Sequence, residues 1–184
     1  MVDRMCLKTL LAAFLVSAFA LPGYCQTSVN LMMKAIEINV AEVELGKMAS
    51  AKATHPRVKE FAELMVKDHS DALTKLHELQ GDGAMPDVKP NMKHQQQADR
   101  LSKLSGADFD REYMKAMVAD HQEAVRFLEQ QRGRKQTVSA AANVQNMARV
   151  AQELLPTVQH HLELAQQILK EIQTGSKVKS QSKR

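Results

Sequence analysis

The chain has almost no cysteine, few aromatic residues and no tryptophan. Its two cysteines, Cys6 and Cys25, both lie within the first 25 residues. If the chain is cleaved after Cys25, no thiol remains, which excludes disulfide bonds, thiolate catalysis and cysteine-based zinc sites. Aromatic residues make up only 4% of the sequence, whereas alanine, leucine, methionine, glutamate, glutamine and lysine are abundant. This composition favours helices.

Hydrophobic runs long enough to cross a membrane, about 20 residues, are also absent after the N-terminal segment. In that segment, Arg4 and Lys8 precede an apolar run over 9–21, and small residues follow. This pattern indicates an export signal over residues 1–25. We therefore expect a protein of the periplasm or cell envelope, without a transmembrane segment in the mature chain, so that any membrane contact is peripheral.

The formal net charge of +4 is carried by the C-terminal tail. Four basic residues and no acidic residue follow Gly175, so the rest of the chain is formally neutral. A neutral body is not the electrostatic footprint of a nucleic-acid-binding protein. We expect residues 175–184 to form a basic disordered tail, with contact to an anionic envelope surface as the alternative.

Apolar residues recur at helical spacing in four long segments separated by turn residues. The expected helices cover about 30–53, 58–79 with Pro56 at the first helical position, 108–133, and about 137–174. A short extra helix over 92–104 is expected in the crossover between the second and third, and no segment shows the alternation of a strand. The sequence thus predicts an all-α fold, an antiparallel four-helix bundle over residues 26–174.

One stretch of the sequence occurs twice. Met-Val-Lys-Asp-His-Ser-Asp-Ala-Leu at 65–73 returns as Met-Val-Ala-Asp-His-Gln-Glu-Ala-Val at 117–125. In both copies the histidine, His69 or His121, falls on the apolar stripe of an amphipathic helix and therefore faces the core. Two buried imidazoles need polar partners in a low-dielectric interior, and a shared metal ion or a shared carboxylate would supply them.

Counting along the helices brings a carboxylate to the same level as these histidines. At about 1.5 Å per residue, Glu42, His69 and His121 all fall near mid-height, with Asp68 and Asp120 beside them. One carboxylate with two imidazoles suits zinc, iron or divalent copper, with the aspartates as direct ligands or as partners that orient the imidazoles. The alternative is a buried glutamate–histidine hydrogen-bond network that holds no ion.

A second polar layer is expected at one end of the bundle. His161 lies on the apolar stripe of the last helix, and counting from Gly133 places it opposite the start of the third helix. We expect a structural polar tie there, in which Asp110 or Tyr113 hydrogen-bonds the imidazole of His161.

Catalytic signatures are missing from the sequence. There is no Glu-x-x-His pair of the kind that di-iron bundles repeat, no P-loop, no GxGxxG and no GxSxG. We therefore expect a protein that is not an enzyme.

The chain resembles a family of exported bacterial proteins grouped as domain of unknown function 4142. The resemblance is carried by motifs at 42–46 (Glu-Val-x-Leu-Gly), 58–62 (Val-Lys-x-Phe-Ala) and 106–113 (Gly-x-x-Phe-Asp-x-x-Tyr), by both repeat copies, and by 155–165 (Leu-Pro leading to His-Leu-x-x-Ala). It implies a ferritin-like four-helix bundle in the envelope and no established activity, and members are often labelled outer membrane proteins. The repeat also resembles those of a second exported helical family, linked to copper handling, which tends to have His-His where this chain has Asp-His.

These observations lead to one functional hypothesis with two alternatives. The hypothesis is an envelope protein that binds a divalent transition metal in its core, in a storage, buffering or stress role. The first alternative is a non-catalytic envelope scaffold whose buried polar residues only specify packing. The second is a bundle oxidase with a degenerate two-metal site. The sequence identifies no protein partner.

Overall fold

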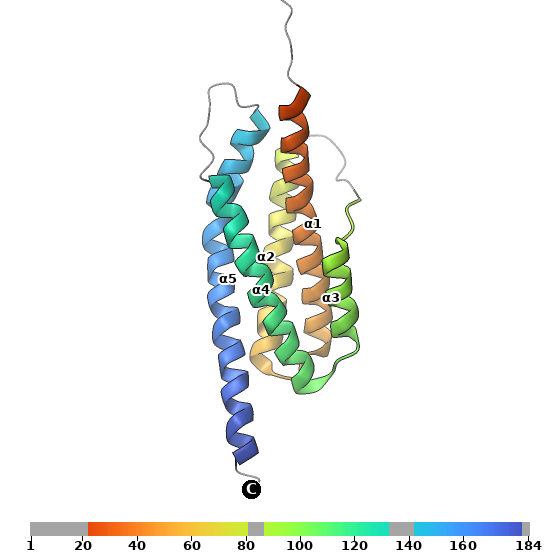
Figure 1. Ribbon diagram of the computed structural model, residues 1–184, viewed down its shortest axis with the longest axis vertical. Helices are drawn as coiled ribbons and strands as arrows, with labels where there is room; N and C mark the ends of the chain where they lie inside the picture. The colour runs from red at the N-terminus through yellow and green to blue at the C-terminus, as the bar shows by residue number, and fades with distance from the viewer. Residues whose placement is uncertain (1–21, 81–86, 133–141, 182–184) are drawn as a thin grey trace, which may run out of the picture.

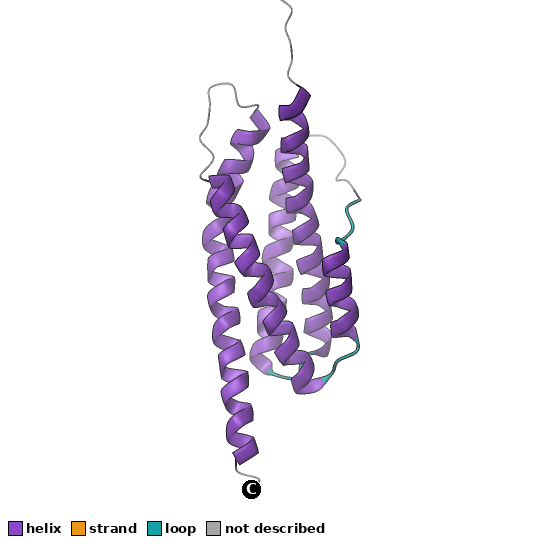
Figure 2. Ribbon diagram, viewed as in Figure 1, coloured by secondary structure: helices purple, strands orange, loops and turns teal. Residues whose placement is uncertain are grey.

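The computed structural model describes residues 22–80, 87–132 and 142–181 of the chain. These residues form five helices and no strand (Figure 2), which confirms the all-α prediction. The helices are α1 (Pro22–Lys52), α2 (Pro56–Gln80), α3 (Met92–Ser102), α4 (Gly106–Arg132) and α5 (Ala142–Gln181). Most of the predicted export signal, residues 1–21, and the predicted start of the last helix near residue 137 lie outside the described residues.

The four long helices lie side by side as two antiparallel pairs (Figure 1). α1 packs along α2, and α4 packs along α5, while the shorter α3 lies against α1 and α4. Gly46 permits the close approach within the first pair. A Cβ atom at this position would lie 2.9 Å from Val66 Cγ2 and 3.1 Å from the Ala62 carbonyl oxygen, so any larger residue would push α2 away from α1.

Two helix starts follow local sequence rules, whereas α1 begins at Pro22 rather than near residue 30 and α5 ends later than predicted. Pro56 begins α2, where its missing N–H costs no hydrogen bond, and the Asn91 side chain caps α3 by accepting from the backbone N–H of His94. The prediction that the last helix stops at Gly175 was wrong, since α5 continues to Gln181. A glycine costs about 1 kcal/mol relative to alanine inside a helix but does not by itself end one. Residues 175–181 of the predicted disordered tail are therefore helical.

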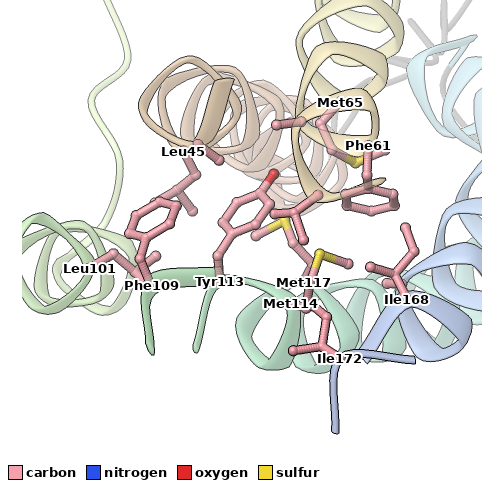
Figure 3. Close-up of a cluster of buried hydrophobic side chains, with 14 residues drawn as sticks. Leu45, Phe61, Met65, Leu101, Phe109, Tyr113, Met114, Met117, Ile168 and Ile172 are labelled. Atoms are coloured by element: carbon pink, nitrogen blue, oxygen red, sulfur yellow. The ribbon is translucent and has the colours of Figure 1, made fainter. Parts of the chain in front are cut away.

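The largest apolar cluster fills the space between all five helices. Figure 3 shows its side chains meeting in the interior: Leu45 from α1, Phe61 and Met65 from α2, Leu101 from α3, Phe109, Tyr113, Met114 and Met117 from α4, and Ile168 and Ile172 from α5. All of them are at most 7% exposed. Because Met65 and Met117 are each four residues before a repeat histidine, this cluster adjoins the region where the two histidines enter the core.

A buried carboxylate joins the two helical pairs at one end. Asp110 of α4 is 2% exposed and accepts hydrogen bonds from Thr54 N (3.1 Å), Thr54 Oγ1 (2.6 Å) and His55 N (2.9 Å), in the turn before α2. The predicted tie between Asp110 or Tyr113 and His161 was wrong. The hydroxyl of Tyr113 has no hydrogen-bond partner among the described residues, and its ring stacks on Phe109.

We predict that Asp110→Ala lowers the free energy of unfolding by about 2–3 kcal/mol, because three donors lose a buried charged acceptor. Urea denaturation followed by circular dichroism would measure this loss. Asp108→Ala, at an exposed carboxylate on the same helix, is the control, and its effect should stay below about 0.5 kcal/mol. Equal losses in the two variants would contradict the assigned role of Asp110.

Candidate metal centre

Three histidines from three helices meet in the interior. His69 of α2, His121 of α4 and His161 of α5 are 7%, 1% and 1% exposed. Each offers a ring nitrogen, and these three nitrogens lie within 4.8 Å of one another. The ring centroids are 5.7 Å apart for His69 and His121, 5.6 Å for His69 and His161, and 5.4 Å for His121 and His161. We call these three residues the histidine triad.

The hydrogen bonds of the triad determine which nitrogen of each ring carries a proton. His121 Nδ1 lies 2.9 Å from the Met117 carbonyl oxygen, which can only accept, so Nδ1 is the protonated nitrogen. His69 Nδ1 lies 2.8 Å from Asn39 Oδ1. The amide nitrogen of Asn39 already donates to the Ala35 carbonyl, so its oxygen accepts from His69. His161 Nε2 donates to Asp68 Oδ2 at 2.9 Å.

The remaining nitrogen of each ring has a free lone pair. His69 Nε2, His121 Nε2 and His161 Nδ1 are buried and have no hydrogen-bond partner among the described residues. A buried acceptor without a partner lowers the free energy of unfolding by about 1–3 kcal/mol, so three such acceptors in one core are unusual. This arrangement matches the way metal-binding histidines are built, with one nitrogen held by a carbonyl or carboxylate and the other left for the metal.

Burial keeps all three imidazoles uncharged. It lowers the pKa of His69 well below the ordinary value, and the other two histidines lower it further. The pKa of His121 falls to about 4, chiefly through burial and then through His161. Burial also lowers the pKa of His161, although the hydrogen bond to Asp68 opposes this shift. Neutral imidazole is the form that ligates metals, so no proton has to leave the triad near pH 7.

One aspartate of the repeat supports the triad. The side chain of Asp68 is 21% exposed and accepts the hydrogen bond from His161 Nε2. Burial opposes its ionisation, but hydrogen bonds from His161 and Lys67 hold the pKa of Asp68 below its ordinary value. Asp68 is therefore an anion that orients a ring of the triad, which is the second of the two roles expected for it.

The other predicted ligands lie outside the triad. In the described part of the chain, the group of side chains able to hold a metal contains His69 and His121 but neither Glu42 nor Asp120. Asp120 instead accepts a hydrogen bond from Gln97 Nε2 (2.6 Å) and pairs with Lys93 Nζ (3.0 Å), both on α3. The predicted cluster of Glu42 with two histidines was therefore wrong in its carboxylate, and His161 takes the third position.

Sequence reasoning misplaced His161 because it assumed that the last two helices are level at Gly133. His161 lies 19 residues, or about 28 Å, after the start of α5 at Ala142, whereas His121 lies only 11 residues, or about 17 Å, before the end of α4 at Arg132. The two rings are nevertheless 5.4 Å apart, so the ends of the two helices are not level. The signal that could have found His161 is the apolar stripe of the last helix, where this histidine stands among core residues like the other two.

Glu42 forms a separate buried polar group with α4. Glu42 is 2% exposed, and its Oε2 has no hydrogen-bond partner among the described residues. Burial, and then the charge of Glu42, raise the pKa of the Tyr113 hydroxyl, which has no partner among these residues either. Burial, and then the charge of Asp120, raise the pKa of Glu42 to about 8, while Lys93 acts in the opposite direction. At pH 7 this carboxyl group is mostly protonated.

Comparison with known proteins agrees with the motifs. Residues 19–168 match the family described as "Domain of unknown function (DUF4142)". The chain belongs to this family. No curated protein matches the sequence significantly. Among the described helices, none is long and apolar enough to cross a membrane.

A solved structure with the description "CopM in the Cu(II)-bound form" is similar in fold. The TM-score is 0.59 at 16% sequence identity, and the similarity covers 78% of this chain and 95% of the other. At this level of identity the likeness establishes the shared helical fold and nothing about ligands.

We predict that Glu42→Gln removes a pH dependence of stability. An unfolded glutamate titrates near 4.5 and the folded one near 8, so between these values only the folded state binds the proton. Stability is then fully present below pH 4.5 and falls as the pH rises towards 8, on the order of 1 kcal/mol per pH unit. Denaturation at pH 5 and pH 8 should show a variant close to wild type at pH 5 and clearly more stable at pH 8.

The histidines also alter stability in this range, but they act equally in both proteins, so the difference between the proteins isolates Glu42. Glu44→Gln, at an exposed glutamate of the same helix, is the control and should leave the pH profile unchanged. A constant difference between Glu42→Gln and wild type across the range would show that Glu42 titrates normally.

Proposed function

We propose that this protein binds a transition-metal ion, zinc or divalent copper, through His69, His121 and His161. The observation that carries the proposal is the convergence of three buried, uncharged imidazoles, each of which also keeps one ring nitrogen without a hydrogen-bond partner among the described residues. A metal ion gives each of these nitrogens the partner that it lacks. A core that needed the histidines only for packing would gain from burying apolar side chains there instead.

The donor set favours zinc and copper over iron. Three imidazole nitrogens suit zinc and divalent copper, whereas non-haem iron sites combine two histidines with a carboxylate. Glu42, the carboxylate expected to complete such a site, lies outside the group of side chains able to hold an ion. Bonds of about 2.0–2.1 Å to a single tetrahedral ion place its nitrogen ligands about 3.3–3.4 Å apart, which is inside the 4.8 Å within which one ring nitrogen of each histidine lies from the others.

We assign this binding to the cell envelope and the fold to a ferritin-like four-helix bundle. The export signal expected over residues 1–25 supports secretion to the periplasm, and a protein of similar fold has been solved with divalent copper bound. We assign a storage, buffering or stress role rather than turnover, because the sequence has no recognised catalytic motif. The principal alternative is a scaffold in which the triad holds no ion.

We predict that the mature protein, exported and purified without chelators, binds one zinc or copper ion per chain. His69→Ala and His161→Ala should each abolish stoichiometric binding, since two imidazoles without a carboxylate leave the ion under-coordinated. Metal content by mass spectrometry and titration with a competing chelator would measure the loss. Binding should also raise the free energy of unfolding, by about 2.7 kcal/mol at a free metal concentration 100 times the Kd.

His160→Ala is the matched control, because His160 is the neighbour of His161 on α5 but is exposed. This variant should bind as much metal as wild type. A wild-type protein that stays empty after loading with zinc, copper and iron would overturn the proposed function and leave the scaffold as the explanation.

We predict that Asp68→Asn weakens metal binding by about 10–100-fold without abolishing it, because the His161 ring loses its anionic partner. Asp71→Asn is the control, since Asp71 lies on the same helix, also pairs with Lys67 and is 63% exposed at its side chain. The dissociation constants of both variants can be measured by chelator competition. Equal affinities would show that Asp68 has no part in the site.

A further inference from the structure

The geometry points to an anion-binding site in the cavity beside the histidine triad. We infer that this cavity admits one small monodentate anion, which becomes the fourth ligand of the metal. The inference rests on the proposed function, because the triad has to hold a metal for the anion to bind. It goes beyond that function by assigning the coordination position that the protein itself leaves open.

The two sides of the triad differ. On one side the ring of Phe61 closes the site, with its centroid 6.4 Å from that of His121 and 6.5 Å from that of His161. Phe61 belongs to the large apolar cluster shown in Figure 3, which also includes Met65 and Met117. A ligand cannot approach a metal from that side without displacing the core.

On the other side lies a cavity of about 60 Å³ whose wall includes His69, His161 and Asp68. Its remaining lining comes from residues one to three turns away on the same helices and from α1: Ala35, Ile38, Asn39, Ala72, Ala124, Phe127, Leu128, Val150, Leu154, Thr157 and Val158. Three imidazoles fill three positions of a four-coordinate ion. Because two of the three rings, His69 and His161, line this cavity, it is the space from which a fourth ligand can reach the ion.

The charges at the site favour an anion. Three neutral imidazoles leave the double positive charge of the ion uncompensated, and the nearby carboxylate of Asp68 balances only part of it. In the described part of the chain, Asp68 is the only carboxylate that lines the cavity. A single negative charge from outside the protein would complete the balance in surroundings that screen charge poorly.

Size and lining restrict the kind of anion. One water molecule requires about 10–15 Å³ of such space, so 60 Å³ accommodates a few atoms. The wall is mostly apolar, and the amide of Asn39 is already hydrogen-bonded to His69 and Ala35. Sulfate or phosphate, which require several hydrogen-bond donors, are therefore unsuited to the cavity, whereas azide, cyanide or chloride fit it.

Azide is the probe for the test. Wild-type protein loaded with divalent copper and titrated with azide should develop an azide-to-copper charge-transfer absorption that saturates at one azide per copper, with the copper content unchanged after gel filtration. Sulfate at the same concentration should leave the spectrum unaltered. Copper that stays bound without any azide absorption would overturn the inference and leave the proposed function standing.

Filling the cavity should block the anion while preserving the metal. Ala72→Leu on α2 and Ala124→Leu on α4 enter the cavity from two walls, and each should weaken azide binding about tenfold at unchanged copper content. Ala51→Leu, at an exposed position of α1, is the control and should bind azide as wild type does. Unchanged azide affinity in both cavity variants would overturn the assignment of the site.

If the two cavity-filling variants fail to hold copper, a variant with a larger cavity tests whether the anion binds there. Val158→Ala enlarges the cavity on α5, and it should raise the affinity for the longer thiocyanate ion relative to azide. An unchanged ratio would contradict binding in the cavity. A wild-type protein that takes up neither copper nor zinc would overturn the proposed function itself, and that outcome is visible in the metal content before any anion is added.

Discussion

The burial of three uncharged imidazoles between α2, α4 and α5 is the constraint on which the site depends. Each ring uses one nitrogen to reach a fixed acceptor: a backbone carbonyl for His121, an amide oxygen for His69 and a carboxylate for His161. These bonds fix the tautomers and leave the other nitrogen of each ring without a proton. The low dielectric of the interior keeps the rings neutral, which makes the unpartnered lone pairs costly without an ion and well suited to one.

The polar residues of the core divide into groups with different roles. The triad with Asp68 can bind an ion, because three rings converge and each keeps one nitrogen without a hydrogen-bond partner among the described residues. Asp110 holds the turn before α2, which fixes the end of one helical pair against the other. Glu42 is buried beside Tyr113 and near Asp120, and it lies outside the group of side chains able to hold an ion. Similar residue types thus differ in function because their surroundings differ.

The repeated stretch shows which features of the structure the local sequence pattern predicts. Helical spacing predicts that His69 and His121 face inward, and the structure places both rings in the core, 5.7 Å apart. The same reasoning correctly gives an all-α fold and the starts of α2 and α3. These features depend on residues three to five positions apart, whose relation is set by the helix itself.

Only the tertiary structure determines which side chains of different helices meet. Glu42 and His161 each lie on an inward stripe, so the sequence identifies both as core residues, but their heights depend on where each helix begins and how the helices cross. An error of a few residues in one boundary moves a side chain by more than a helical turn, or about 5.4 Å, which exceeds the reach of a hydrogen bond or a metal bond. The sequence by itself therefore determined the helices and their buried faces, while only the packed structure chose His161 rather than Glu42 as the third member of the site.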